Sequence, residues 1–151
     1  MKFSTHSHCA GEKSVSLGLQ NEVRQVITSI SIAPKIGAAR KLRDSFLLTL
    51  KTFGWSSEYP VSIGSDITIT SVKQGVGLCL QTGNMARMYA DLIKLQTLYL
   101  NDAIKSAVIV LPSQPMAKLL GSNIAQAKRL ERELEIFRKA YHVPTLIYAL
   151  E

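Results

Sequence analysis

The sequence has few cysteines, no long apolar run and few acidic side chains, and these shortages exclude several classes of protein. Cys9 and Cys79 are its 2 cysteines, too few for the disulfide framework of a small secreted domain. The longest apolar stretches, such as 107–112 and 146–150, are far too short to cross a bilayer. The opening segment MKFSTHSHCAGEKS lacks the apolar core of a secretory signal. We therefore expect a cytoplasmic protein with no membrane partner.

Internal repeats, low-complexity tracts and linkers are also absent from the 151 residues. A chain of this length can form one domain whose core needs no disulfide or metal. Its content of 46% hydrophobic and 19% charged residues is typical of a globular protein. We expect residues 1–14 to form a flexible N-terminus and residues 15–151 to form a single domain.

Basic side chains outnumber acidic ones by 18 to 11, which gives a net charge of +7. The first 52 residues hold eight basic and three acidic side chains, whereas residues 53–105 hold four of each. Clustered positive charge attracts the phosphate backbone of nucleic acids through counterion release, although it can also be a solvated face that aids solubility. The side chains that we expect to meet DNA phosphates in this region are Lys35, Arg40, Lys41 and Arg43.

The apolar pattern predicts two helices followed by alternating strands and helices. A continuous apolar run over 106–111 is typical of a strand buried on both faces. Helices followed by a meander and then by strand–helix–strand crossovers indicate an α/β sandwich with a mixed sheet. The predicted helices cover 15–32, 38–53, a segment beginning at Asn84, and 123–141; the predicted strands cover 59–63, 66–72, 76–82, 106–111 and 145–150.

Residues 75–100, GVGLCLQTGNMARMYADLIKLQTLYL, carry the most specific motif of the chain. Their strand ending in Gln81, their Gly-Asn step and their Asp-Leu-x-Lys helix resemble the BglII-like restriction endonucleases of the PD-(D/E)XK nuclease superfamily. The resemblance covers 59–111, and 123–150 is compatible with the closing helix and strand of that family. It implies a restriction-endonuclease-like α/β fold with a mixed five-stranded sheet flanked by helices. It also implies a homodimer on double-stranded DNA.

Two positions of this hairpin depart from the family pattern. In the family, two carboxylates hold Mg²⁺, which activates water, and a Lys or Gln two positions after the second acid helps to hold that water. When Gln81 is placed on the family's Gln, the second acid falls on Cys79 and the first falls on Thr70. Mg²⁺ requires hard oxygen ligands, and a thiol or a lone hydroxyl is a poor substitute. The resemblance therefore implies a pseudo-nuclease without a cofactor.

An alternative active site can be assembled from four other side chains. Asp66 lies four residues before Thr70 at the start of the same strand, and Glu22 comes from the first helix. Together with Gln81 and Lys94, these acids would give a Mg²⁺-dependent endodeoxyribonuclease with Asp66 as a metal ligand. The simpler interpretations are that Asp66 is a turn residue and that Glu22 is a solvated helix acid.

The sequence thus favours a restriction-endonuclease-like DNA-binding protein that cuts DNA weakly or not at all, and that is a regulator or inhibitor in a defence or mobile-element system. The first alternative is the type II-like endonuclease, which hydrolyses DNA phosphodiesters. The second is an inhibitor that binds a protein partner. Besides the basic cluster of the first third, Arg87 would meet DNA near the former cleft, beside Lys94.

Overall fold

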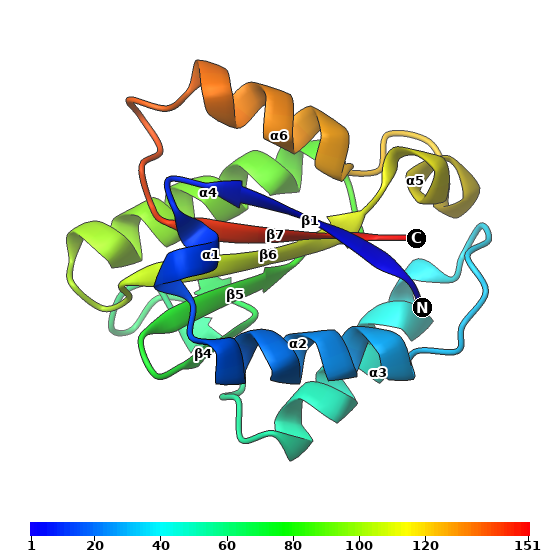
Figure 1. Cartoon of the computed structure of the whole chain (residues 1–151), viewed down its shortest axis with the longest axis horizontal. Coiled ribbons are helices and arrows are strands. Elements are labelled where there is room, and N and C mark those ends of the chain that lie inside the picture. Colours follow the sequence, from blue (N-terminus) through cyan, green and yellow to red (C-terminus); the bar gives the residue numbers. More distant parts are fainter.

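The computed structural model describes all 151 residues and contains one five-stranded mixed sheet with helices on both faces (Figure 1). The strand order is β1-β7-β6-β5-β4. Strands β5, β6 and β7 are parallel to one another, and the edge strands β1 and β4 are antiparallel to their neighbours. The strand bounds are β1 Phe3–His8, β4 Ser71–Lys73, β5 Val76–Leu80, β6 Ser106–Pro112 and β7 Thr145–Leu150, and a separate small sheet pairs β2 Tyr59–Pro60 with β3 Thr68–Ile69.

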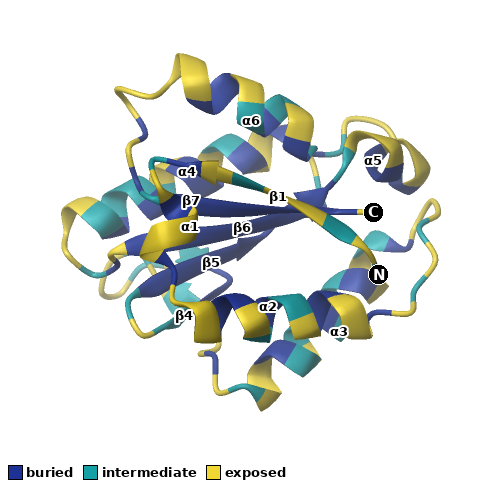
Figure 2. Cartoon of the chain, viewed as in Figure 1, coloured by how far each residue is buried: buried dark blue, intermediate teal, exposed yellow.

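The central strands are buried along their whole length (Figure 2). Each of these three strands is covered by helices on both faces, so nearly every side chain in them can be apolar. This explains why the run SAVIVLP of β6 shows no alternation of apolar and polar residues. The prediction of a doubly buried strand over 106–111 is therefore confirmed.

The sheet divides the core into two apolar clusters, one between each face and the helices that cover it. Helices α2 and α3 cover one face, where Phe46 packs in the same cluster as Tyr148, and α4 and α6 cover the other face, where Leu95 packs in the same cluster as Ile109 (Figure 1). None of the helices combines the length and apolarity that spanning a bilayer requires. The helix bounds are α1 Gly11–Ser14, α2 Leu17–Ser29, α3 Ala39–Thr52, α4 Met85–Leu100, α5 Gln114–Leu120 and α6 Ala127–Ile136.

The N-terminal segment differs from the flexible terminus expected for residues 1–14. Strand β1 pairs with β7 from Phe3 opposite Leu150 to His8 opposite Thr145. The sequence of this strand, FSTHSH, is mostly polar because an edge strand faces solvent along much of its length. Its backbone hydrogen bonds to β7, which the residue pattern does not reveal, order the segment.

Smaller differences concern the ends of the elements. Helix α5 is missing from the sequence prediction because it is short, although Ser113 caps its N-terminus by accepting from the Met116 N–H. The predicted strand over 66–72 is split, because Thr70 separates β3 from β4. The last helix ends at Ile136, five residues before the predicted end.

The close packing of α1 against β7 gives a test of the ordered N-terminal segment. A Cβ atom on Gly11 would lie 2.1 Å from the carbonyl carbon of Thr145, a backbone atom that cannot move aside. We expect Gly11→Ala to lower the free energy of unfolding by roughly 2–4 kcal/mol in urea denaturation.

Gly18 supplies the matched control, because a Cβ there meets nothing within 4 Å. Gly18→Ala lies inside α2 and should raise the free energy of unfolding by about 0.5–1 kcal/mol. Equal stability of Gly11→Ala and the wild type would contradict the docking of the N-terminal segment.

Candidate functional site

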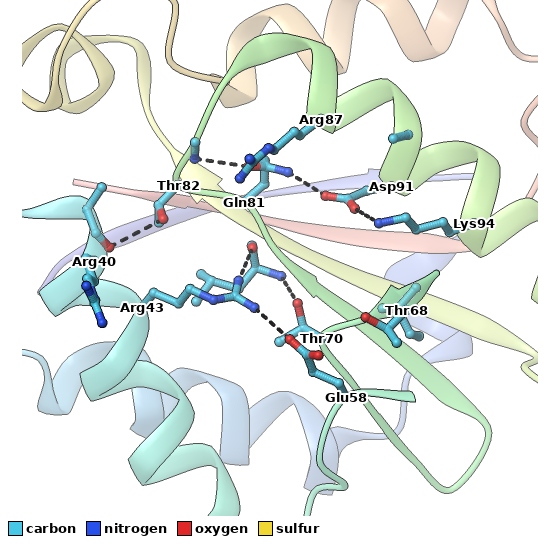
Figure 3. A pocket seen from close by; sticks show the side chains of 15 residues that line it. Arg40, Arg43, Glu58, Thr68, Thr70, Gln81, Thr82, Arg87, Asp91 and Lys94 are labelled. Carbon is cyan, nitrogen blue, oxygen red and sulfur yellow. Dashed lines mark hydrogen bonds and ion pairs between the residues drawn. The ribbon is translucent and has the colours of Figure 1, made fainter. Parts of the chain in front are cut away.

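A cavity of about 560 Å³ lies where β5 ends, between α3 and α4 (Figure 3). We call it the central cavity. It sits outside the carboxyl end of a parallel strand, the usual position of a ligand site in an α/β sheet. Most of its lining is polar, and the polar or charged side chains are Arg40, Arg43, Glu58, Thr68, Thr70, Gln81, Thr82, Arg87, Asp91 and Lys94.

Gln81, Asp91 and Lys94 form a hydrogen-bonded chain along one wall of the central cavity (Figure 3). The side-chain amide of Gln81 donates to Asp91 Oδ2 at 2.7 Å, and Lys94 Nζ donates to Asp91 Oδ1 at 3.3 Å. The Gln81 oxygen accepts from the Gly83 N–H at 3.0 Å. Both ends of the Gln81 amide are therefore held in place by the protein.

Asp91 is the more buried of the two acids of the cavity, with 12% of its side chain exposed. Burial raises the pKa of its carboxyl, while the hydrogen bond from Gln81 and the charge of Lys94 act in the opposite direction. Through the first of these hydrogen bonds, Asp91 braces the Gln81 amide against α4.

The opposite wall of the cavity is formed by Arg43 on α3 and by Glu58, which precedes β2. Arg43 donates through Nη1 to the carbonyl oxygen of Leu80 at 3.3 Å, and its Nη2 lies 3.6 Å from Glu58 Oε1. The guanidinium is thus anchored to the end of β5 on one side and faces a carboxylate on the other.

The sequence prediction places the family's two acids on Thr70 and Cys79, and in the structure both side chains meet structural needs of the hairpin. The Thr70 hydroxyl lines the cavity but accepts from the Leu80 N–H at 3.0 Å. Cys79 lies in the apolar cluster beneath α4, and burial, followed by the nearby charge of Asp91, raises the pKa of its thiol well above its ordinary value. Nowhere in the chain do three His, Cys, Asp or Glu side chains gather so that they could hold a metal ion. Mg²⁺ takes one or two carboxylates fixed by the protein, and the two in this cavity, Asp91 and Glu58, each already face a cation of the chain.

The four side chains of the alternative active site are not brought together. Gln81 and Lys94 line the central cavity, but Asp66 is exposed in the turn between β2 and β3 and does not line it. Glu22 on α2 pairs with Lys73 at 2.7 Å and accepts from the Trp55 indole N–H at 2.8 Å. Both acids therefore lie outside the cavity. Their spacing along the chain could not show this, because it does not determine how separate segments dock.

The predicted DNA contacts divide in a similar way. Arg40, Arg43 and Arg87 line the central cavity, whereas Lys35 and Lys41 are exposed and do not line it. Sequence reasoning missed Glu58 altogether, because no motif distinguishes it from other loop acids. Asp91 belongs to the Asp-Leu-x-Lys step of the motif, but the sequence indicated no role for it in the site.

The fold is that of the restriction endonucleases. The crystal structure of restriction endonuclease BglII complexed with a DNA 16-mer matches with a TM-score of 0.86 at 13% identity, over 99% of this chain and 76% of that one. Free BglII matches with a TM-score of 0.73 at 15% identity, over 100% of this chain and 80% of that one.

The chain belongs to the BglII/BglIII restriction endonuclease family, whose pattern matches residues 3–150. The resemblance inferred from the hairpin motif and the predicted fold class are therefore both confirmed. A search of curated proteins finds no match.

The buried carboxyl of Asp91 predicts a pH dependence of stability. Its folded-state pKa is raised, so the stability that it contributes is complete below the unfolded pKa of about 4 and is lost as pH rises through the folded pKa. The free energy of unfolding of the wild type minus that of Asp91→Asn should fall as pH increases from 4 to 7, measured by urea denaturation.

Asp102→Asn is a suitable control, because it removes an exposed carboxyl that does not line the central cavity. A wild-type advantage over Asp91→Asn that grows with pH would show instead that the charged carboxylate stabilises the fold.

Proposed function

We propose that this protein binds double-stranded DNA through the central cavity and is a pseudo-nuclease that cleaves DNA weakly or not at all. The observation that carries the proposal is the charge of the lining: Arg40, Arg43, Arg87 and Lys94 against Glu58 and Asp91. Each of the two acids already faces a cation, at 3.6 Å and 3.3 Å. The excess positive charge suits the phosphates of a DNA backbone.

Arg87 is a cation of the cavity with no acidic partner in the chain. It is exposed at the rim of the cavity and forms no ion pair, and its Nη1 lies near Gly83, where the backbone turns from β5 into α4. Arg43 is half-buried and fixed by the Leu80 carbonyl, so its guanidinium is already oriented. A pre-oriented cation loses less side-chain entropy when it binds an anion. Further support comes from the family, since a BglII of the same fold is known in complex with a DNA 16-mer.

The proposed absence of strong cleavage rests on the poor fit of the cavity to Mg²⁺. Hydrolysis in this family depends on a divalent ion that activates water and neutralises charge at the phosphate. In this chain, Lys94 and the arginines supply positive charge in the cavity, and its two carboxylates, Glu58 and Asp91, each face one of these cations. Binding should therefore need no divalent ion.

The alternative function is a Mg²⁺-dependent endodeoxyribonuclease. Family membership favours it, as does the presence of Gln81, Asp91 and Lys94 in one cavity. Asp66 and Glu22 would have to move to reach these side chains, whereas Asp91 is already there. The two functions differ in whether the protein cleaves the DNA that it binds when a divalent ion is added.

The wider setting is also a proposal. A homodimer straddling the duplex is consistent with the family resemblance, and a cytoplasmic location is consistent with two free cysteines. A regulatory or inhibitory role with a protein partner is a separate proposal, which co-purification of that partner would support if the chain failed to bind DNA at low salt.

A single charge change tests the DNA-binding proposal. Arg87→Gln should weaken binding to a fluorescently labelled duplex about tenfold, because one phosphate contact is lost. For the same reason the negative slope of log K against log salt should become shallower by about 1. The measurement is fluorescence anisotropy in EDTA at several NaCl concentrations.

Lys105→Gln is the matched control, because Lys105 is exposed and does not line the cavity. It should change the affinity less than about twofold, since its charge is largely screened from a ligand in the cavity. Equal losses for the two variants would point to diffuse surface charge and contradict a binding site in the cavity.

A further inference from the structure

The two acids of the central cavity are held in different ways, which suggests different roles. Asp91 is buried and accepts two hydrogen bonds, one of them from Gln81 at 2.7 Å. The Glu58 side chain is 63% exposed and has one ion-pair contact, to Arg43 at 3.6 Å. An exposed pair at that distance contributes little to stability. Glu58 can therefore leave Arg43 without disturbing the fold, whereas Asp91 cannot leave Gln81.

The position of Glu58 gives its carboxylate a second property, since it stands where two cavities meet. A second cavity of about 370 Å³ lies beside the central one, and both are lined by Glu58 and Thr70. The second cavity also contains the Lys51 side chain and the serines at positions 56 and 57. Once Glu58 has moved away, the polar side chains that remain in this lining are one cation, Lys51, and hydroxyl groups, which suit a phosphate backbone that continues past Arg43.

We propose that Glu58 is an internal anion that holds Arg43 in the free protein and is displaced by a DNA phosphate. The inference rests on the proposed DNA-binding function. A carboxylate and a phosphate both offer oxygen acceptors to a guanidinium, so they compete for the N–H groups at Nη2 of Arg43. Nη1 keeps its hydrogen bond to the Leu80 carbonyl, so the guanidinium keeps its orientation during the exchange. Departure of Glu58 also moves a side chain that lines both cavities, and a DNA strand held at Arg43 would continue toward Lys51.

The first test uses Glu58→Gln, which keeps the shape of the side chain and removes its charge. This variant should bind a labelled duplex about three- to fivefold more tightly than the wild type, which corresponds to the loss of one exposed ion pair. Asp102→Asn, which removes an equal charge from an exposed position outside both cavities, should change the affinity less than about twofold.

The second test does not depend on DNA. Inorganic phosphate is titrated into ¹⁵N-labelled protein, and the Arg43 side-chain signals are followed by NMR. Glu58→Gln should show half-saturation at a lower phosphate concentration than the wild type or Asp102→Asn, because its Arg43 carries no competing carboxylate.

The outcomes separate this inference from the proposed function. Tighter binding of both DNA and phosphate by Glu58→Gln, but not by Asp102→Asn, supports the competition. If no variant binds DNA while phosphate still binds Glu58→Gln more tightly, the DNA role is overturned and the competition at Arg43 stands. If Glu58→Gln and Asp102→Asn behave alike in both assays, the inference is overturned even where DNA binding holds.

Discussion

The hydrogen bond between Gln81 and Asp91 is the contact on which the site depends. It joins the end of β5 to the inner face of α4 at 2.7 Å, and the same Gln81 amide is fixed by the Gly83 N–H at 3.0 Å. The bond is buried, where loss of one partner would leave an unsatisfied polar group at a cost of about 1–3 kcal/mol. It therefore fixes the wall that presents Lys94 to the cavity, and Arg43 faces it from α3. Each of these two walls pairs a cation with an acid, and Arg40 and Arg87 supply the excess positive charge of the cavity.

The same contact gives Gln81 a structural role in this chain. The Gln that would help to hold a water molecule in a nuclease of this family here holds a carboxylate of its own chain. The Thr70 hydroxyl accepts a hydrogen bond from the Leu80 N–H, and Cys79 lies in the apolar core beneath α4. Each of these side chains thus satisfies a structural need of the hairpin. The chain shares the fold of BglII at 13% identity, and its cavity is lined by four basic and two acidic side chains.

The sequence predicted the parts of the fold that depend on local patterns. Apolar runs identified the buried strand β6, and the hairpin-to-helix motif identified the family and placed Gln81 and Lys94 in the site. Strand β1 was missed because its order comes from pairing with β7, some 140 residues away in the chain. Glu58 was missed, and Asp66 and Glu22 were grouped with Gln81, for the same reason: the docking of distant segments determines which acids reach the cavity.

The central claim is that the cavity binds the DNA backbone with arginine and lysine side chains and needs no divalent ion. Incubation of supercoiled plasmid with excess protein in Mg²⁺ or Mn²⁺, beside a binding assay in EDTA, tests it most directly. The account predicts that the plasmid is retained in the complex and remains supercoiled after deproteinisation. Conversion to linear DNA that requires the metal would contradict it, because the protein would then hold a divalent ion that activates water at the phosphate.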